Sequence, residues 1–222
     1  MIRKIASSLT LLAALMFLLA PAGARADGLS LNVSVDTSTL GQSGPSEIFF
    51  VLTDGNAPAA GGNTATFSTF AFGTAGTGGL VDTLNTFGDV TFGTNLADGA
   101  TMVSDQFTNE FAGFCTAGSE ISFLLNLTTN LAPGAPTPDQ LAIYIADPTG
   151  NLVASADPSG FDSLLLINID SASPTVNSYS SIVSASPVGT VPTPEPETLL
   201  LLTAGLAGLG IFRKRASTTP IA

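Results

Sequence analysis

The sequence contains no histidine and no tryptophan, and it has a single cysteine, Cys115. Without histidine, neither Ser-His-Asp nor Cys-His catalysis can operate, and histidine-ligated zinc sites are excluded. A lone cysteine cannot form an internal disulfide. Its neighbours Phe111 and Phe114 favour a buried thiol that behaves as a small apolar group, and a thiol that cross-links to a partner is the alternative.

Basic residues are missing from most of the chain. All of them lie near its two ends, at Arg3, Lys4, Arg25, Arg213, Lys214 and Arg215. The stretch 27–193 holds 15 of the 17 carboxylates and no cation. It cannot neutralise phosphates, which excludes a nucleic-acid partner. It also has no lysine to act as a nucleophile or a Schiff base.

The acidity of this stretch does not indicate disorder. Charged residues make up only 10% of the chain and hydrophobic residues 45%, with a mean hydropathy of +0.44. Disordered chains are poor in apolar residues. About 160 residues are enough for one hydrophobic core, so we expect one folded domain.

The periodicity of this domain is that of β-strands. Apolar and polar residues alternate over 29–35 and 121–127, which is typical of strands with one buried face. The segments 47–52, 141–146 and 164–169 are more continuously apolar, as in strands buried on both faces. Clusters of Gly, Pro, Asn and Asp separate these segments. The pattern predicts an all-β fold, a single antiparallel β-sandwich or jelly roll.

The domain boundaries follow from composition. We expect the β-sandwich to cover residues 27–170. Residues 171–193 are rich in Ser, Thr and Pro, which predicts an exposed stalk.

The N-terminus has the three parts of a secretory signal peptide, which we assign to a helical segment within residues 1–26. A basic pair precedes the apolar run 5–20, and Ala24-Arg25-Ala26 fits an A-x-A cleavage site. Cleavage by signal peptidase after Ala26 would leave Asp27 as the mature N-terminus. The chain is therefore predicted to be exported.

The C-terminus combines an extended strip, an apolar segment and a charge cluster. Pro194-Glu195-Pro196 precedes a predicted transmembrane helix at 198–212, a basic cluster (Arg213, Lys214 and Arg215) and a tail at 216–222. As a helix the apolar segment is about 22 Å long, which is short for a hydrocarbon core of about 30 Å. It must therefore recruit Ala216 and snorkelling basic side chains, thin the bilayer, or serve only as a temporary anchor. The basic cluster would stay cytoplasmic, which places the preceding residues on the far side of the membrane.

This C-terminal pattern, over residues 191–215, resembles the PEP-CTERM sorting signal of exported bacterial proteins. The resemblance implies that an exosortase, a membrane-embedded transpeptidase-like enzyme, recognises and processes the signal. It also implies a Gram-negative-type, biofilm-forming bacterium that makes extracellular polysaccharide. The domain itself resembles an uncharacterised family of PEP-CTERM ectodomains at 33–37, 107–111, 157–160, 168–170 and 174–176. That second resemblance implies a shared β fold and no known activity.

Together these features predict a protein anchored in the inner membrane on the periplasmic side before processing, and delivered afterwards to the cell surface or the extracellular matrix. We expect a non-catalytic, acidic β-sandwich associated with extracellular polysaccharide. One alternative is a glycan-binding adhesion module, which a concave sheet face with exposed Tyr144 or Tyr179 would favour. Another is a glycoside hydrolase, which needs two carboxylates about 5–10 Å apart across a cleft. No catalytic residue is identified.

Calcium is the one metal for which the sequence offers candidate ligands. Asp147, Asn151, Asp157 and Asp162 form the densest group of oxygen ligands, which calcium prefers. No EF-hand loop is present, and Asp-Pro-x-Gly is by default a β-turn in which the Asp accepts hydrogen bonds from its own backbone. The turn is the preferred interpretation, and a calcium site is the alternative.

Overall fold

The structure is a computed structural model, and it describes residues 27–40, 44–55, 62–116, 118–129, 137–169 and 174–188. Residues 26–190 cluster into one compact unit. The predicted signal peptide, the sorting strip, the transmembrane helix, the basic cluster and the tail lie outside the described residues, apart from Asp27 at the predicted cleavage site.

The described part of the chain is built almost entirely of β-strands, with one short 3₁₀ helix, η1. In chain order the elements are β1 (Asp27–Asp36), β2 (Pro45–Thr53), β3 (Thr64–Ala71), β4 (Thr77–Val81), β5 (Val90–Phe92), η1 (Leu96–Asp98), β6 (Ala100–Val103), β7 (Thr108–Thr116), β8 (Glu120–Thr129), β9 (Asp139–Ala146), β10 (Leu165–Ile169), β11 (Thr175–Ser178) and β12 (Val183–Pro187).

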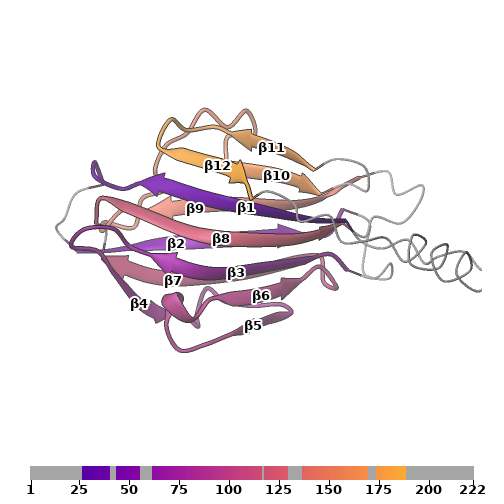
Figure 1. The fold of residues 1–222 in the computed structure, drawn as a ribbon, viewed down its shortest axis with the longest axis horizontal. Coiled ribbons are helices and arrows are strands. Elements are labelled where there is room, and N and C mark those ends of the chain that lie inside the picture. The colour runs from indigo at the N-terminus through magenta and orange to yellow at the C-terminus, as the bar shows by residue number, and fades with distance from the viewer. Residues whose placement is uncertain are drawn as a thin grey trace, which may run out of the picture. The chain divides into compact units, whose positions relative to one another are not determined.

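These strands form two antiparallel sheets, and the prediction of an all-β fold is confirmed (Figure 1). Sheet A has the order β12-β1-β8-β3-β6-β5, and sheet B has the order β11-β10-β9-β2-β7-β4. Most neighbours in each sheet are distant in sequence; β1, for example, pairs with both β8 and β12. The flanking helices of the prediction fall outside the described residues.

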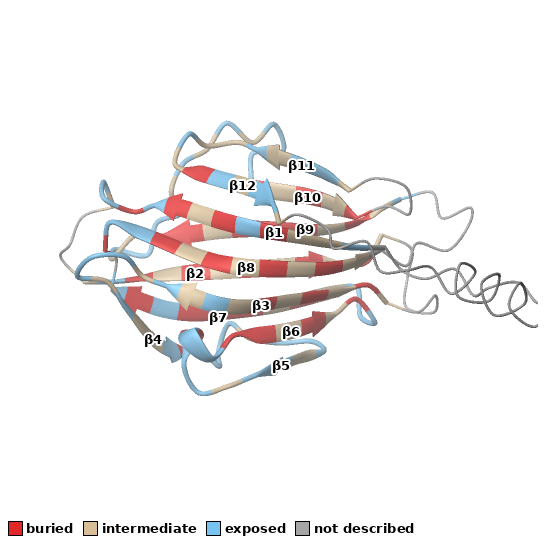
Figure 2. Cartoon of the chain, viewed as in Figure 1, coloured by how far each residue is buried: buried red, intermediate tan, exposed pale blue. Residues whose placement is uncertain are grey.

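The core lies between the two sheets. Along each central strand every second side chain is buried, as the alternation predicts, and Figure 2 shows the resulting bands. Phe50 of sheet B meets Phe67 of sheet A with ring centroids 4.2 Å apart, and it also contacts Phe111 and Phe123. Such aromatic clusters bury large apolar area, so this cluster joins the two sheets into a β-sandwich.

The expectation that the most apolar strands are buried on both faces is wrong for β2 and β10, and it holds in part for β9, where the outward Ala142 and Ala146 are also buried. Strand β2 alternates between buried and partly exposed residues, and Phe49 and Val51 face outward. Tyr144 of β9 and Leu166 of β10 are also partly exposed. In a two-layer sandwich each sheet packs through one face only, so the extra apolar residues of these strands lie on the outer face of sheet B.

The predicted stalk at 171–193 is also wrong over residues 174–188, which belong to the sandwich. Strand β11 pairs with β10, and β12 pairs with β1 from Leu31 opposite Pro187 to Val35 opposite Val183. Both are edge strands, whose outer face is solvated and tolerates Ser and Thr. Pro187 lacks an N–H group but is acceptable at an edge, where one side of the strand is unpaired. The folded domain therefore extends past the predicted boundary at residue 170.

Candidate functional site

The outer face of sheet A is formed by short polar side chains, and we call it the hydroxyl face. Its strands place apolar residues inward and the intervening residues outward, as one-sided strands do. The outward residues carry hydroxyl or amide groups almost throughout: Ser30, Asn32, Ser34, Thr64, Thr66, Ser68, Thr101, Ser122, Asn126, Thr128, Ser184 and Ser186. Leu124, Val103 and Ala71 are apolar residues that also face outward, and Asp36 and Glu120 lie opposite each other at one end.

In one half of the hydroxyl face the side chains bond to one another across the strands. Ser30 Oγ donates to Asn126 Oδ1 at 2.6 Å. The hydroxyls of Thr64 and Thr128 lie 3.2 Å apart, as do those of Thr66 and Thr101. Cross-strand pairs of this kind stabilise the sheet, and they satisfy their polar groups internally.

In the other half of the hydroxyl face the polar side chains do not bond to one another across the strands. Ser184 of β12, Ser34 of β1 and Ser122 of β8 lie in one row across three strands. In the next row Asn32 lies between Ser186 and Leu124. Within the described residues, the side chains of Asn32, Ser34, Ser122, Ser184 and Ser186 form no hydrogen bond. Their donors and acceptors therefore face solvent.

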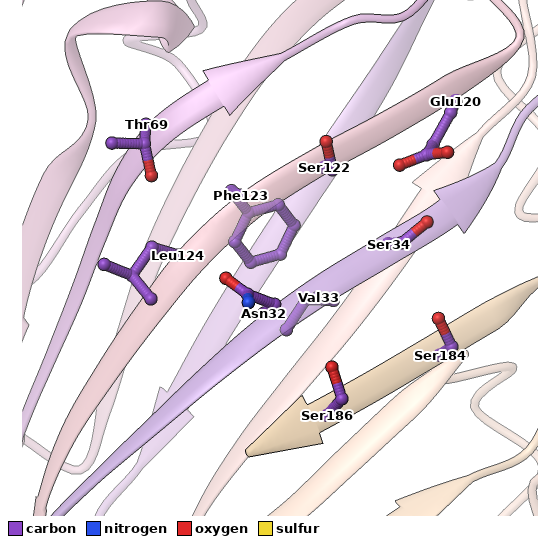
Figure 3. Close-up of a pocket in the computed structure, with 10 residues that line it drawn as sticks. All are labelled: Asn32, Val33, Ser34, Thr69, Glu120, Ser122, Phe123, Leu124, Ser184 and Ser186. Atoms are coloured by element: carbon purple, nitrogen blue, oxygen red, sulfur yellow. The ribbon is translucent and has the colours of Figure 1, made fainter. Parts of the chain in front are cut away.

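This unpaired half contains a depression of about 310 Å³, near the lower end of the range for small-molecule sites. Figure 3 shows the lining, which comprises Asn32, Val33, Ser34, Thr69, Glu120, Ser122, Phe123, Leu124, Ser184 and Ser186. Serines leave room that larger side chains would fill. A bulge in β3 borders the depression, where the pairing of β3 with β8 shifts register between Ser68 and Ala71.

The bulge has an unusual backbone conformation at its centre. Thr69 has φ +53°, in the left-handed region that non-glycine residues rarely adopt. Such conformations persist where the surrounding structure imposes them, and they are frequent at binding sites. Here the conformation places Thr69 on the rim of the depression.

The charge of the depression is low for so acidic a protein. Glu120 is the one carboxylate in its lining, and no basic residue is present there. A pair of carboxylates facing each other across it, as a glycoside hydrolase needs, is not formed by these residues.

A second group of polar residues lies on the outer face of sheet B. Burial raises the pKa of Glu47 to about 7, and a hydrogen bond with Asp82 and the negative charge of Glu110 add to this increase. Glu47 Oε1 is buried and has no hydrogen-bond partner among the described residues. Burial opposes ionisation of Asp82 as well, but hydrogen bonds from Leu84 N, Glu47 and Asn85 outweigh it and lower the Asp82 pKa.

Glu47 and Asp82 form an acidic pair that holds one proton between its two carboxyl groups. The pKa of Glu47 is raised and that of Asp82 is lowered, so Glu47 holds the proton while Asp82 is ionised. In the described parts of the chain, no three acidic or cysteine side chains are placed to hold a metal ion.

The predicted calcium ligands lie in two separate turns. Asp147 Oδ1 accepts hydrogen bonds from Thr149 N at 2.8 Å, Thr149 Oγ1 at 2.6 Å and Asn151 N at 3.0 Å. These bonds are the ones that the turn interpretation predicts.

The second turn follows the same principle. Asp157 accepts from Ser159 N and from both the N–H and the hydroxyl of Ser163, and Asp162 accepts from Ser155 N. Burial opposes ionisation of Asp157, but these hydrogen bonds lower its pKa to about 2. The structure therefore does not bring the four predicted ligands together.

The two tyrosines do not contribute to the depression. Tyr144 lies on the outer face of sheet B, opposite Phe49, and Tyr179 follows β11. The residues that form the depression could not be identified from the sequence, because serine and asparagine at alternate positions are ordinary in a strand with a solvated face. The one available signal is that the same alternation of polar residues recurs in 29–35, 121–127 and 183–187, which would indicate a polar surface shared by three strands.

The cysteine is placed as the sequence predicted. Cys115 points inward from β7 and is buried in the core. Burial raises its pKa to about 11, so the thiol is protonated and unreactive at neutral pH.

Of the targeting residues, Asp27 is described, and it begins β1. Ala24, Ala26, Pro194, Glu195, Pro196, Arg213, Lys214 and Arg215 fall outside the described ranges. In the part of the chain that the structure describes, no helix has the length and apolar character needed to cross a membrane.

Comparison with known protein families identifies one segment of the chain. Residues 192–215 match the family model described as the PEP-CTERM protein-sorting motif. The motif implies that an exosortase recognises the protein during export and that the protein is sorted to the cell surface. No curated protein and no solved structure matches the chain. The resemblance of the domain to other PEP-CTERM ectodomains stays a prediction.

Proposed function

We propose that this chain, a substrate of exosortase sorting through residues 192–215, is a surface or matrix protein whose acidic β-sandwich acts by contact with extracellular polysaccharide and not by catalysis. The sorting motif is the observation that carries the proposal. Signal peptidase removes residues 1–26. The segment 198–212 then holds the protein in the inner membrane of a Gram-negative-type bacterium, with the sandwich on the periplasmic side. Processing delivers it to the surface or the biofilm matrix.

The two chain ends of the folded domain are compatible with removal of the signal peptide before Asp27 and with processing of the sorting motif. Asp27, the residue that follows the predicted cleavage site, begins β1. At the C-terminal end of the described domain, Val188 N donates a hydrogen bond to Ser30 O of β1 at 2.9 Å. The chain therefore enters and leaves the described domain on adjacent strands. Cleavage before Asp27 or C-terminal to Val188 would leave both of these strands whole.

The non-catalytic role is supported by the chemistry that the chain can supply. Histidine is absent, and residues 27–193 have no lysine. The lining of the depression has one carboxylate, Glu120, and not the two that a glycosidase needs. A glycan-binding adhesion module is the second candidate, and the depression on the hydroxyl face favours it.

Mass spectrometry of the protein from its native host, combined with fractionation of the cells, tests the proposal. We expect a mature N-terminus at Asp27, a C-terminus altered within residues 192–215, and recovery in the surface or matrix fraction. Replacing both Pro194 and Pro196 with alanine is expected to leave the protein in the membrane fraction, while P174A, outside the motif, is sorted normally. Full-length protein in the cytosol would overturn the proposal.

A further inference from the structure

We infer that the depression on the hydroxyl face is a binding site for a short segment of an uncharged polysaccharide. The inference deepens the proposed association with polysaccharide and rests on it. The depression is formed by β12, β1 and β8, with Thr69 of β3 on its rim (Figure 3).

Hydrogen-bonding capacity distinguishes this half of the face from the other. The pairs Ser30–Asn126 and Thr66–Thr101 use their polar groups on each other. By contrast, Ser34 and Ser122 form no side-chain hydrogen bond within the described residues, although they lie opposite each other. A ligand rich in hydroxyl groups can pair with these free groups, each of which is both a donor and an acceptor.

Asn32 adds an amide group, which offers two donors and an acceptor in one plane to the hydroxyl groups of a sugar. It is exposed and lies between Ser186 and Leu124. Leu124 is partly exposed and supplies an apolar surface beside the amide. Sugar rings have both hydroxyl edges and C–H faces, so they match a site that is polar around one apolar contact.

The dimensions of the depression suit sugar rings. Three adjacent strands span about 10 Å at about 4.8 Å per step, and two outward residues on one strand are about 6.7 Å apart. This area accommodates about two sugar rings lying against the sheet. A peptide that lies in the depression is a poorer fit, since β1 and β8 are paired on both sides; among these strands only β12 has a free backbone edge, and that edge borders the depression at its side.

Charge selects against acidic ligands. The depression has one carboxylate, Glu120, and no cation. The 27–193 stretch holds 15 carboxylates and no basic residue to offset them. Uronate, sulfate or phosphate groups would be repelled, whereas a neutral glycan is not, so the protein discriminates by unfavourable charge as well as by contact.

Affinity electrophoresis of the purified full-length protein tests the inference. Native gels would contain one of three neutral polysaccharides (dextran, galactomannan or hydroxyethylcellulose) or one of two acidic ones (alginate or polygalacturonate). We expect at least one neutral polysaccharide to retard the protein and neither acidic one to do so. In that gel, S122F, which fills the depression, and the double variant N32A/S34A, which removes its polar groups, should each weaken binding at least about tenfold.

T101A, in the half whose side chains are paired, is the matched control and should bind like the wild type. Circular dichroism of each variant checks that it is folded, and N32A/S34A keeps the test valid if S122F is not. The inference is overturned if no neutral polysaccharide retards the protein, if an acidic one retards it more strongly, or if folded N32A/S34A binds as tightly as the wild type. If the protein is recovered in the matrix fraction, any of these three results refutes the binding site alone. If the protein is absent from that fraction, the proposed function itself is refuted.

Discussion

Val35 lies directly opposite Val183, and this pairing joins the first strand after the predicted signal-peptide cleavage site to β12, the last strand of the described residues. Both side chains are buried in the core. The sandwich is therefore complete only when the segment 183–187 has been added to sheet A. Residues that precede the sorting motif by only a few positions are structural parts of the domain.

Removing this segment should destabilise the domain. A fragment of residues 27–169 lacks β11 and β12, so it loses the buried Val183 side chain and the pairing with β1. We expect its thermal midpoint to fall by at least about 5–10 °C relative to a fragment of residues 27–188. Circular dichroism of both fragments measures this, and equal midpoints would restore the interpretation of 171–193 as a stalk.

Asp139 should be essential for stability because it links the two sheets at one end of the sandwich. Its carboxylate accepts hydrogen bonds from Gly55 N at 3.0 Å, Asn63 Nδ2 at 2.8 Å and Ser104 Oγ at 2.7 Å. Alanine at this position would leave several buried donors without this acceptor.

We expect D139A to lower the free energy of unfolding by about 2–5 kcal/mol in urea denaturation. D89N, at an exposed position, is the control and should change it by less than about 0.5 kcal/mol. A change in D139A no larger than that of the control would show that the network contributes little.

Glu47 should make stability fall as pH rises. Its pKa is raised by burial from 4.5 to about 7 in the folded state, so the native protein holds a proton that the unfolded chain releases. Folding is then opposed increasingly as pH rises from about 4.5 through 7, and the full penalty applies above that range. E47Q cannot ionise, so it should be more stable than the wild type above pH 7, with a flatter profile.

Urea denaturation at several pH values between about 4 and 9 measures this dependence. E120Q removes a negative charge at an exposed position and controls for the change in net charge. If E47Q and the wild type have parallel profiles, then Glu47 is not protonated in the native state.

Cys115 should be inaccessible in the native protein. Burial raises its pKa to about 11 and leaves no route for a reagent. We expect no reaction with a thiol reagent such as dithionitrobenzoate until denaturant is added, and complete reaction afterwards. Rapid labelling of the native protein would indicate that the thiol is exposed and available for cross-linking.

The sequence by itself determined the class of fold, the destination and the chemistry that is excluded. Alternation over 29–35 and 121–127 is a local property, because side chains of a strand point to opposite faces in turn, and β1 and β8 were therefore predictable. The sorting signal was predictable for a similar reason: residues 192–215 are a linear motif that is recognised without reference to the rest of the fold.

Only the tertiary structure decided which strands are neighbours, and with them the boundary of the domain and the site. Ser34, Ser122 and Ser184 are far apart in sequence, and they form one row because β1 pairs with both β8 and β12. A local pattern fixes which face of each strand is buried, but the choice of neighbouring strands depends on how the buried faces of both sheets pack together. For the same reason, the polar segment 183–187 resembled a stalk until its pairing with β1 showed that Val183 lies in the core.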